Sequence, residues 1–329
     1  MKKILLLTGP AGDAQGWGDI KVTEEVCKAI NASGKEAEIA FVSSMDEFYT
    51  AIEEKNFDLV WSALYHISSK SETIGMSEGD EKWLADIFDD RSIPYIGPNA
   101  GTMKALIHKT ATHKIMAANN VPVPYHYQIE SGDALPELTF PAFVKPSYES
   151  RSVGINDDSV VENPKALEKQ VAFIHKEYDQ PALVEEYLPG KEYTVLMLGN
   201  GKHQEFLPGK VEVDKSLFGK YPILRADLRG VGATKIRPTN THAKEAIEVT
   251  RQAMEALNCL DHVRADMRLD AHGKLKIIEV NGIPGLKPIK SWSPQMFTMH
   301  HPSAQGPMED YRLLIDHIVT SALARYNLI

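Results

Sequence analysis

The sequence predicts an α/β protein of two or three domains, and three observations lead to this fold class. The first hundred residues alternate short apolar runs with amphipathic stretches of helical period, which is typical of βαβ units whose parallel sheet is covered by helices. Residues 263–286 instead indicate an antiparallel hairpin. At 329 residues the chain is also too long for one typical hydrophobic core.

Composition indicates a globular protein and excludes several partners. A hydrophobic content of 43% and a charged content of 25% are ordinary for such proteins. The net charge of −9 and the pI near 5.8 argue against nonspecific binding to nucleic acid or to an acidic membrane, so we expect neither partner. No stretch approaches the roughly 20 apolar residues that span a bilayer. Cys27 and Cys259 stand far apart in helical patterns, so we expect reduced thiols and a cytoplasmic protein.

The first hundred residues read as alternating strands and helices. We expect strands at residues 3–8, 38–42, 57–64 and 94–96, and helices near 22–32, 45–55 and 78–89. The glycine-rich turn after the first strand lacks the GxGxxG fingerprint, so we expect no dinucleotide site there.

The remaining elements follow less regularly. We expect one helix at residues 102–120, strands at 141–146, 182–187 and 192–198, and further helices at 164–178, 241–257 and 311–326. Residues 206–238 are polar and irregular in pattern, so no element is expected there.

The hairpin at residues 263–286, VRADMRLDAHGKLKIIEVNGIPGL, carries charges on one face. If Leu269 faces Lys274 across the loop, Asp266 lies diagonal to Glu279, because side chains alternate faces along a strand. The side chains sharing that face are then Arg264, Asp266, Glu279 and Asn281.

Three oxygen-bearing side chains of this face form a candidate metal site. The carboxylates of Asp266 and Glu279 and the amide of Asn281 are hard ligands, which suit Mg²⁺. The alternative is an ordinary hairpin whose charged face is solvated.

Two other stretches carry weaker signals for nucleotide binding. Lys145 ends an apolar strand before a polar loop, SYESRSVG, whose amides and hydroxyls suit phosphate oxygens, although a solvated loop fits equally. Glu185, Glu186, Tyr187 and Leu188, followed by Glu192, suit an adenine edge and a ribose, or a charged hinge. The adjacent His300 and His301 point apart in an extended chain, so we expect loop residues that could still line an acceptor pocket.

Taken together and in order, these pieces resemble one family. Lys109, the FVKP strand, the SVGI loop end, VEEYLPGKE and RADMRLD…KIIEVNGIPGL resemble ATP-grasp ligases, and most closely the D-alanine–D-alanine ligase-like carboxylate–amine ligases. The resemblance implies a three-domain ATP-grasp fold in which two α+β lobes enclose the nucleotide. Its parts would be an N-terminal parallel α/β domain at residues 1–101, a central lobe at 102–205 and a C-terminal domain at 206–329.

The resemblance also implies a role for each candidate residue. The ATP phosphates would contact Lys109, Lys145, Ser150, Ser152, Val153 and Gly154, with Ser152 also close to the chemistry. Adenine would contact Glu185, Glu186, Tyr187 and Leu188, and the ribose Glu192. Two Mg²⁺ ions, with Mn²⁺ as a possible substitute, would be held by Asp266, Glu279 and Asn281. The oxyanion of a tetrahedral intermediate would face Arg264 and the Gly285 amide, a mobile loop would supply Lys215, and the second substrate would contact Ser291 and Trp292.

The implied reaction joins a small-molecule acid to an amine. The acid attacks the γ-phosphate of ATP to give an acyl phosphate and ADP, and the amine then displaces phosphate. Two departures from the family pattern make two D-alanines an unexpected substrate pair. Arg151 replaces a small loop residue, and Lys21 aligns with a glutamate that receives an amino group. A cyclising ligase and a nucleotide-binding regulator remain as alternatives, and the family implies a homodimer.

Overall fold

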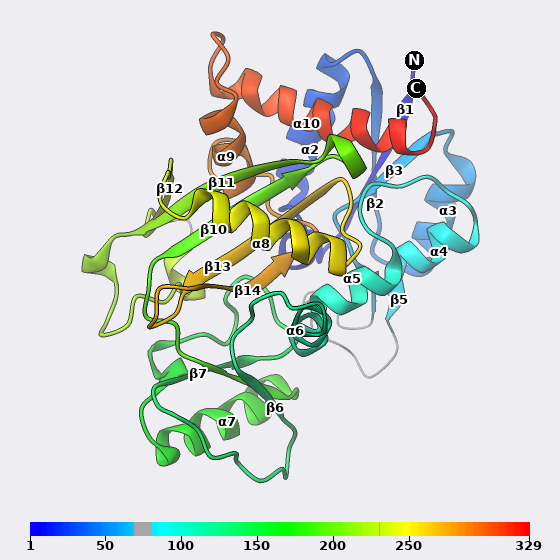
Figure 1. The fold of residues 1–329 in the computed structure, drawn as a ribbon. Helices are drawn as coiled ribbons and strands as arrows, with labels where there is room; N and C mark the ends of the chain where they lie inside the picture. The colour runs from blue at the N-terminus through cyan, green and yellow to red at the C-terminus, as the bar shows by residue number, and fades with distance from the viewer. Residues whose placement is uncertain (69–80, 230) are drawn as a thin grey trace.

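The computed structural model describes residues 1–68, 81–229 and 231–329, and it confirms the α/β class (Figure 1). At the N-terminus, β1 (Lys3–Thr8) lies between β2 (Glu36–Phe41) and β3 (Leu59–Ser62) in a parallel sheet. The helices of this part are α1 (Gly12–Gln15), α2 (Ile20–Ala32), α3 (Met45–Glu54) and α4 (Leu84–Asp90). The predicted βαβ alternation is therefore confirmed, although residues 94–96 supply only an isolated bridge from Tyr95 to Val60.

The helix expected at residues 78–89 begins later than predicted. Residues 78–80 lie outside the described part, and β5 (Lys82–Trp83) pairs with β4 (His66–Ile67) before α4 starts. The expected helix at 102–120 is divided into α5 (Ala100–Ile107) and α6 (Lys109–Ala118). His108 between them has ψ of 88°, which no α-helix accommodates, and the Lys109 amide donates to the Ser147 carbonyl at 3.3 Å. The break thus places Lys109 beside the polar loop.

The central lobe is a four-stranded antiparallel sheet with one helix on it. Its strand order is β6 (His126–Ile129), β9 (Ala182–Glu186), β7 (Ala142–Pro146) and β8 (Val160–Val161). Helix α7 (Pro164–Tyr178) begins as its sequence suggests, because the Asn163 side chain accepts from the Ala166 amide at 3.0 Å and Pro164 occupies the first turn. Its buried Leu167, Val171 and Ile174 form the core of this lobe with the sheet.

The largest sheet has five antiparallel strands. Its order is β12 (Thr234–Arg237), β11 (Glu205–Val213), β10 (Glu192–Leu198), β13 (His262–Leu269) and β14 (Leu275–Asn281). The expectation of no element at 206–238 was therefore wrong for β11 and β12. Pro208 and Gly209 disguise β11 in the sequence, and Pro208 is tolerated because it lies where β12 does not reach. Helix α8 (Ala243–Ala256) covers one face of this sheet (Figure 1).

Two helices close the chain and join its ends. Helix α9 (Trp292–His300) was not expected, and α10 (Pro307–Arg325) packs against α2 (Figure 1). One hydrophobic cluster includes Leu6 of β1, Ile30 of α2 and Ile318 of α10, so both ends of the chain share a core. The expected domain boundary at residue 205 falls between β10 and β11, which pair with each other, so this sheet extends across it.

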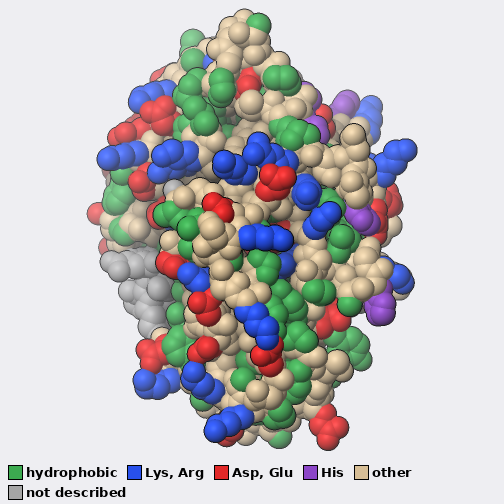
Figure 2. All heavy atoms as spheres, turned by 90° about the vertical axis from the view of Figure 1, so that its left-hand side faces the viewer, with side chains coloured by type: hydrophobic (Ala, Val, Ile, Leu, Met, Phe, Trp, Pro, Cys, Tyr) green, Lys and Arg blue, Asp and Glu red, His purple; other side chains and the backbone are tan. Residues whose placement is uncertain are grey.

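The surface agrees with the charge balance of the sequence. On the face shown in Figure 2, Lys and Arg side chains are interspersed with Asp and Glu. In the part of the chain that the structure describes, every helix is too short or too polar to cross a membrane.

Candidate active site

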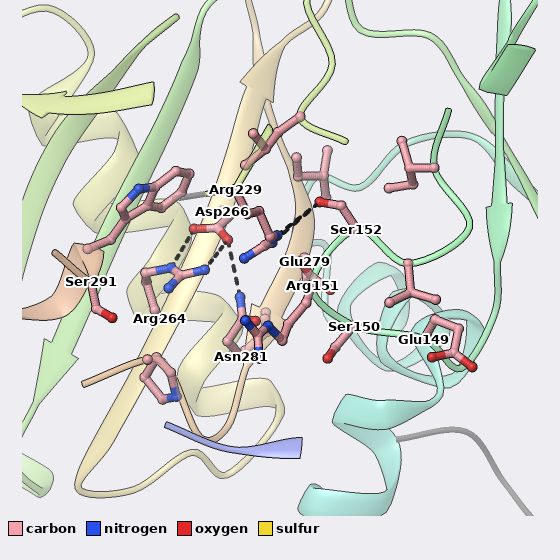
Figure 3. Close-up of a pocket in the computed structure, with 18 of the residues that line it drawn as sticks. Glu149, Ser150, Arg151, Ser152, Arg229, Arg264, Asp266, Glu279, Asn281 and Ser291 are labelled. Carbon is pink, nitrogen blue, oxygen red and sulfur yellow. Dashed lines mark hydrogen bonds and ion pairs between the residues drawn. The ribbon is translucent and has the colours of Figure 1, made fainter. Parts of the chain in front are cut away.

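A cavity of about 1000 Å³ lies where the three parts of the structure meet. Its walls come from the turn around α1, the polar loop after β7, the connection after β9, and the strands β10, β13 and β14. Most residues expected to bind substrates line it: Lys109, Lys145, Ser150, Arg151, Ser152, Val153, Glu185, Glu186, Tyr187, Leu188, Glu192, Arg264, Asp266, Glu279, Asn281, Gly285, Ser291 and Trp292. Figure 3 shows 18 of its residues in close-up and labels ten of them.

The expected side chains of the hairpin line the cavity, although its two strands pair in a different register. Leu269 pairs with Leu275 and not with Lys274, so the sequence-based register was wrong. A shift of one residue reverses which side chains face the cavity. A bulge at Ile278 restores the face, since the register also shifts between Asp266 and Met267.

The bulge brings the two candidate metal carboxylates directly opposite each other. Asp266 pairs with Glu279, and Arg264 pairs with Asn281. Side chains directly opposite in an antiparallel pair have Cβ atoms about 4.5–5.5 Å apart. The expected diagonal arrangement is thus replaced by a closer one.

Asp266 is held by three neighbours. Arg264 donates to both of its oxygens, at 2.8 and 2.7 Å, Thr194 donates at 2.7 Å, and the Asn281 amide nitrogen donates at 3.1 Å (Figure 3). The Asn281 oxygen is therefore the end of that amide left to act as an acceptor. Because Asp266 is only 5% exposed, this network fixes its orientation.

Glu279 is surrounded by cations. Burial raises its pKa, but the neighbouring charges outweigh burial and hold the pKa below its usual value; these are Lys109, Lys145, Arg229 and Arg264. The Lys109 ammonium lies 3.5 Å from the Glu279 carboxylate. Glu279 is therefore an ionised carboxylate that lines the cavity.

These residues fit Mg²⁺ by their chemistry. Within the described ranges, no three His, Cys, Asp or Glu side chains cluster as a metal site. The candidate ligands are the two carboxylates and the one amide that the hairpin brings together. Mg²⁺ commonly takes one or two carboxylates and completes its shell with waters and substrate phosphates.

Lys109 and Lys145 enter the cavity from α6 and β7. Burial lowers the pKa of Lys109, whose ammonium also donates to the Glu149 carbonyl. The Lys145 ammonium lies 2.8 Å from Glu185 and donates to the carbonyl of Ile278 at 3.4 Å. The bulged residue thus also orients a lysine, which the sequence did not indicate.

The candidate adenine residues divide into two groups. Glu185 is buried, with one oxygen on Lys145 and the other 3.4 Å from the His113 ring. Glu186 pairs with Lys276, and it lines the cavity beside Tyr187 and Leu188. Glu185 thus serves to hold Lys145.

Glu192 faces an arginine that was missed from the sequence. Arg268 lies directly opposite Glu192 across β10 and β13, with Nε 4.0 Å from the carboxylate. Burial raises the pKa of Glu192 to about 7, although Arg268 opposes this rise. The sequence contains a pattern that could have indicated Arg268, the motif R-x-D-x-R. Arg264, Asp266 and Arg268 are two residues apart on one strand, so their side chains share one face.

The polar loop after β7 reaches both neighbouring parts. Ser150 donates to the Ala14 carbonyl at 3.1 Å, and Arg151 pairs with Asp13 at 2.5 Å. Ser152 accepts from the Arg229 guanidinium at 3.4 Å (Figure 3). The loop thereby connects α1 to the segment between β11 and β12.

This segment crosses to the central lobe. Its Arg225 pairs with Asp157 at 2.5 Å, and its Lys220 and Tyr221 both contact Glu162. These contacts cover one side of the cavity with residues from another part of the chain.

Three expected residues lie outside the cavity lining: Gly154, which follows the lining residue Val153 in the polar loop, Lys215 and Lys21. Lys215 is exposed in the 3₁₀ turn Lys215–Leu217, and Lys21 is exposed on α2; the described lining includes neither. Arg229, from the segment between β11 and β12, lines the cavity instead. The two histidines also lie elsewhere: His300 contacts the Pro208 carbonyl and His301 contacts Glu205.

The expected second-substrate residues do lie together. The Trp292 ring is 4.9 Å from the Arg264 guanidinium, and the Ser291 hydroxyl accepts from the Lys287 amide at 3.0 Å. A Cβ atom at Gly285 would stand 2.9 Å from that hydroxyl, so a side chain there would displace it.

We predict that Gly154→Ala weakens ATP binding. Gly154 has φ of +76°, and a Cβ atom there would stand 2.3 Å from the Pro146 ring, so the loop must move. The expected loss of stability is about 1–3 kcal/mol, measured by thermal unfolding, with a weaker ATP Kd by calorimetry. Gly273→Ala is the matched control, since Gly273 has φ of +77° but nothing within 4 Å. Equal ATP affinity in both variants would contradict the role of this loop.

The fold and the cavity define an ATP-dependent ligase that forms C–N bonds. The family model "D-ala D-ala ligase C-terminus" matches residues 126–319, and the chain belongs to this family. A D-alanine–D-alanine ligase of Desulforudis audaxviator is 25% identical over 91% of this chain and 92% of its own. An uncharacterized protein of Sinorhizobium fredii is 30% identical over 71% and 68%. The crystal structure of D-alanine–D-alanine ligase from Bacillus anthracis complexed with ATP superposes with a TM-score of 0.74 over 99% of both chains at 17% identity, which concerns the fold.

Proposed function

We propose that the protein activates a carboxylic acid as an acyl phosphate and joins it to an amine, releasing ADP and phosphate. The observation that carries this proposal is the convergence of Asp266 and Glu279 with two buried lysines, Lys109 and Lys145, in one cavity. Carboxylates that hold metal ions and cations that contact phosphate are both needed for phosphoryl transfer.

Residues that line the cavity would assist each step of the reaction. An acid oxygen attacks the γ-phosphorus and ADP leaves, while Lys109, Lys145 and Arg229 neutralise phosphate oxygens. The amine nitrogen then attacks the acyl carbon, and phosphate leaves as the nitrogen loses its proton. The oxyanion formed in between would face Arg264, which Asp266 holds by two hydrogen bonds. The segment bearing Arg229 would exclude water, which otherwise hydrolyses an acyl phosphate.

Two Mg²⁺ ions fit this proposal. Glu279 would bridge them, with Asp266 on one ion and Asn281 on the other. Bound Mg²⁺ supplies charge neutralisation on the β- and γ-phosphates.

We propose a substrate pair other than two D-alanines. Lys21 does not contribute to this proposal, because it lies outside the cavity lining. Arg151 supports the proposal, since it lines the cavity beside Asp13, with which it forms an ion pair. The small neutral side chain of alanine would make no use of this charge.

A screen of acids and amines for ADP release tests this function. Amide product in equal amount to ADP supports the ligase, whereas ADP without any amine requirement supports a cyclising reaction. ATP binding with no ADP from any pair would favour a regulator. Preference for two D-alanines over all other pairs would refute the substrate proposal.

Arg229→Ala is predicted to lower kcat by roughly a hundredfold to a thousandfold. Arg229 contributes a positive charge next to Glu279 and hydrogen-bonds Ser152, so its loss removes a cation from the phosphoryl site. Lys215→Ala is the control and is expected to change kcat less than twofold, because Lys215 lies outside the cavity. A larger effect at Lys215 than at Arg229 would reverse the assignment. The measurement is the steady-state rate of ADP formation with the acid and amine found in the screen.

A further inference from the structure

Strand β13 presents three charged side chains to the cavity at alternate positions. Arg264 and Asp266 are engaged with each other at the candidate metal centre. Arg268 is the third, and it lies two residues beyond Asp266, roughly 7 Å along the strand. It is 9% exposed and lines the cavity without a role in the site described so far.

The contacts of Arg268 are few for a buried guanidinium. One terminal nitrogen donates to the Gly190 carbonyl at 3.3 Å, and Nε is 4.0 Å from the Glu192 carboxylate. The guanidinium carbon lies 5.9 Å from the centre of the Tyr187 ring. Nε itself is buried and has no hydrogen-bond partner among the described residues. Because Nε has no surface that a ligand could reach, the terminal nitrogens are the donors that Arg268 can offer to an acceptor in the cavity.

The position of Arg268 indicates which acceptor that is. Asp266 precedes Arg268 on β13 and belongs to the candidate metal centre, which would hold the triphosphate. Tyr187 belongs to the connection between the two sheets, which would hold the base. A group between them faces the sugar of a bound nucleotide, whose hydroxyl and ring oxygens are acceptors.

We propose that Arg268 is the residue that makes the site selective for a ribonucleotide. It positions the Glu192 carboxylate for the 2′- and 3′-hydroxyls and donates a terminal N–H to an oxygen of the same ribose. The pair acts as a unit, because Glu192 alone would be a buried carboxylate with no cation opposite it. This inference rests on the orientation of ATP in the proposed function.

Calorimetric titration with ATP and with 2′,3′-dideoxy-ATP, both with Mg²⁺, tests the inference without knowledge of the acid or amine. The intact protein is expected to bind ATP at least tenfold more tightly than the dideoxy nucleotide. Arg268→Met should weaken ATP binding about tenfold to a hundredfold and change dideoxy-ATP binding less than twofold, so that the preference disappears. Arg268→Lys keeps the positive charge but loses the planar guanidinium with its several N–H donors, so it should lose part of the preference for ATP over the dideoxy nucleotide. It also provides a second variant if the methionine variant folds poorly.

Two further variants separate positioning from a purely structural role. Glu192→Gln should also remove the preference, and Glu192→Gln with Arg268→Met should bind ATP no more weakly than either single variant. Arg237→Met is the control, because Arg237 forms an exposed ion pair with Glu212 away from the cavity. Equal weakening of both nucleotides in Arg268→Met, or additive losses in the double variant, would overturn the inference. Equal binding of both nucleotides by the intact protein would also overturn it, whereas no binding of ATP at all would refute the proposed function itself.

Discussion

Glu279→Gln is expected to abolish magnesium-dependent turnover, lowering kcat by at least roughly a hundredfold to a thousandfold. Glu279 is directly opposite Asp266 and would be shared by both ions, so its loss affects the whole centre. Glutamine keeps the shape of the side chain but cannot supply the negative charge that four neighbouring cations now balance. Those cations are then left facing one another, which adds to the loss of phosphate positioning.

The readouts are ADP formation and the Mg²⁺ dependence of ATP binding by calorimetry. In the variant, ATP affinity should no longer respond to Mg²⁺ as it does in the intact protein. Glu212→Gln is the matched control, since Glu212 pairs with Arg237 on the exposed sheet edge and lies outside the cavity lining. Near-normal turnover in Glu279→Gln would exclude this carboxylate as a ligand.

Arg325→Met is expected to lower the free energy of unfolding by about 3–5 kcal/mol, the cost of breaking a buried ion pair. Asp261 is fully buried, and the Arg325 guanidinium lies 2.6 Å from its carboxylate. The same guanidinium donates to the Tyr95 carbonyl at 2.8 Å, and the Gly97 amide donates to Asp261 at 2.8 Å. These bonds join the last helix to the N-terminal part and to the strand β13 region, so methionine leaves a buried charge at a three-way junction.

Urea unfolding measures this effect. Adding Asp261→Asn to Arg325→Met should recover part of the loss, because the uncompensated charge is then gone. The exposed pair supplies the control, and Arg237→Met should cost less than about 1 kcal/mol. If Arg237→Met and Arg325→Met lowered the free energy of unfolding by similar amounts, the buried charge of Asp261 would not explain the effect of Arg325→Met.

Much of the fold was predictable because it depends on neighbouring residues. The sequence shows the hydrophobic patterns of the strands β1 and β10. It also shows the N-terminal cap of the helix α7, which begins at Pro164 as expected. The hidden strands β11 and β12 were not predictable. Pro208 and Gly209 oppose a strand locally, and only pairing with β10 overrides them.

The candidate site was predictable by residue type more than by geometry. Asp266, Glu279 and Asn281 were predicted from their spacing, yet the pairing expected for Asp266 was two residues off, with Ile277 in place of Glu279. The bulge at Ile278 corrects the face, and no local pattern announces it. Lys21 and Lys215 followed only from the resemblance to the family, and neither lines the cavity.

By itself, the sequence determined the family, the class of reaction and most of the side chains that meet in the cavity, because these follow from motifs and from local periodicity. Only the tertiary structure decided that Arg229 and not Lys215 enters the site, that Arg268 faces Glu192, and that Arg325 meets Asp261. Each of these depends on segments far apart in the chain that packing brings together. A contact of that kind leaves no periodic trace in either segment, so it becomes visible only when both are folded against each other.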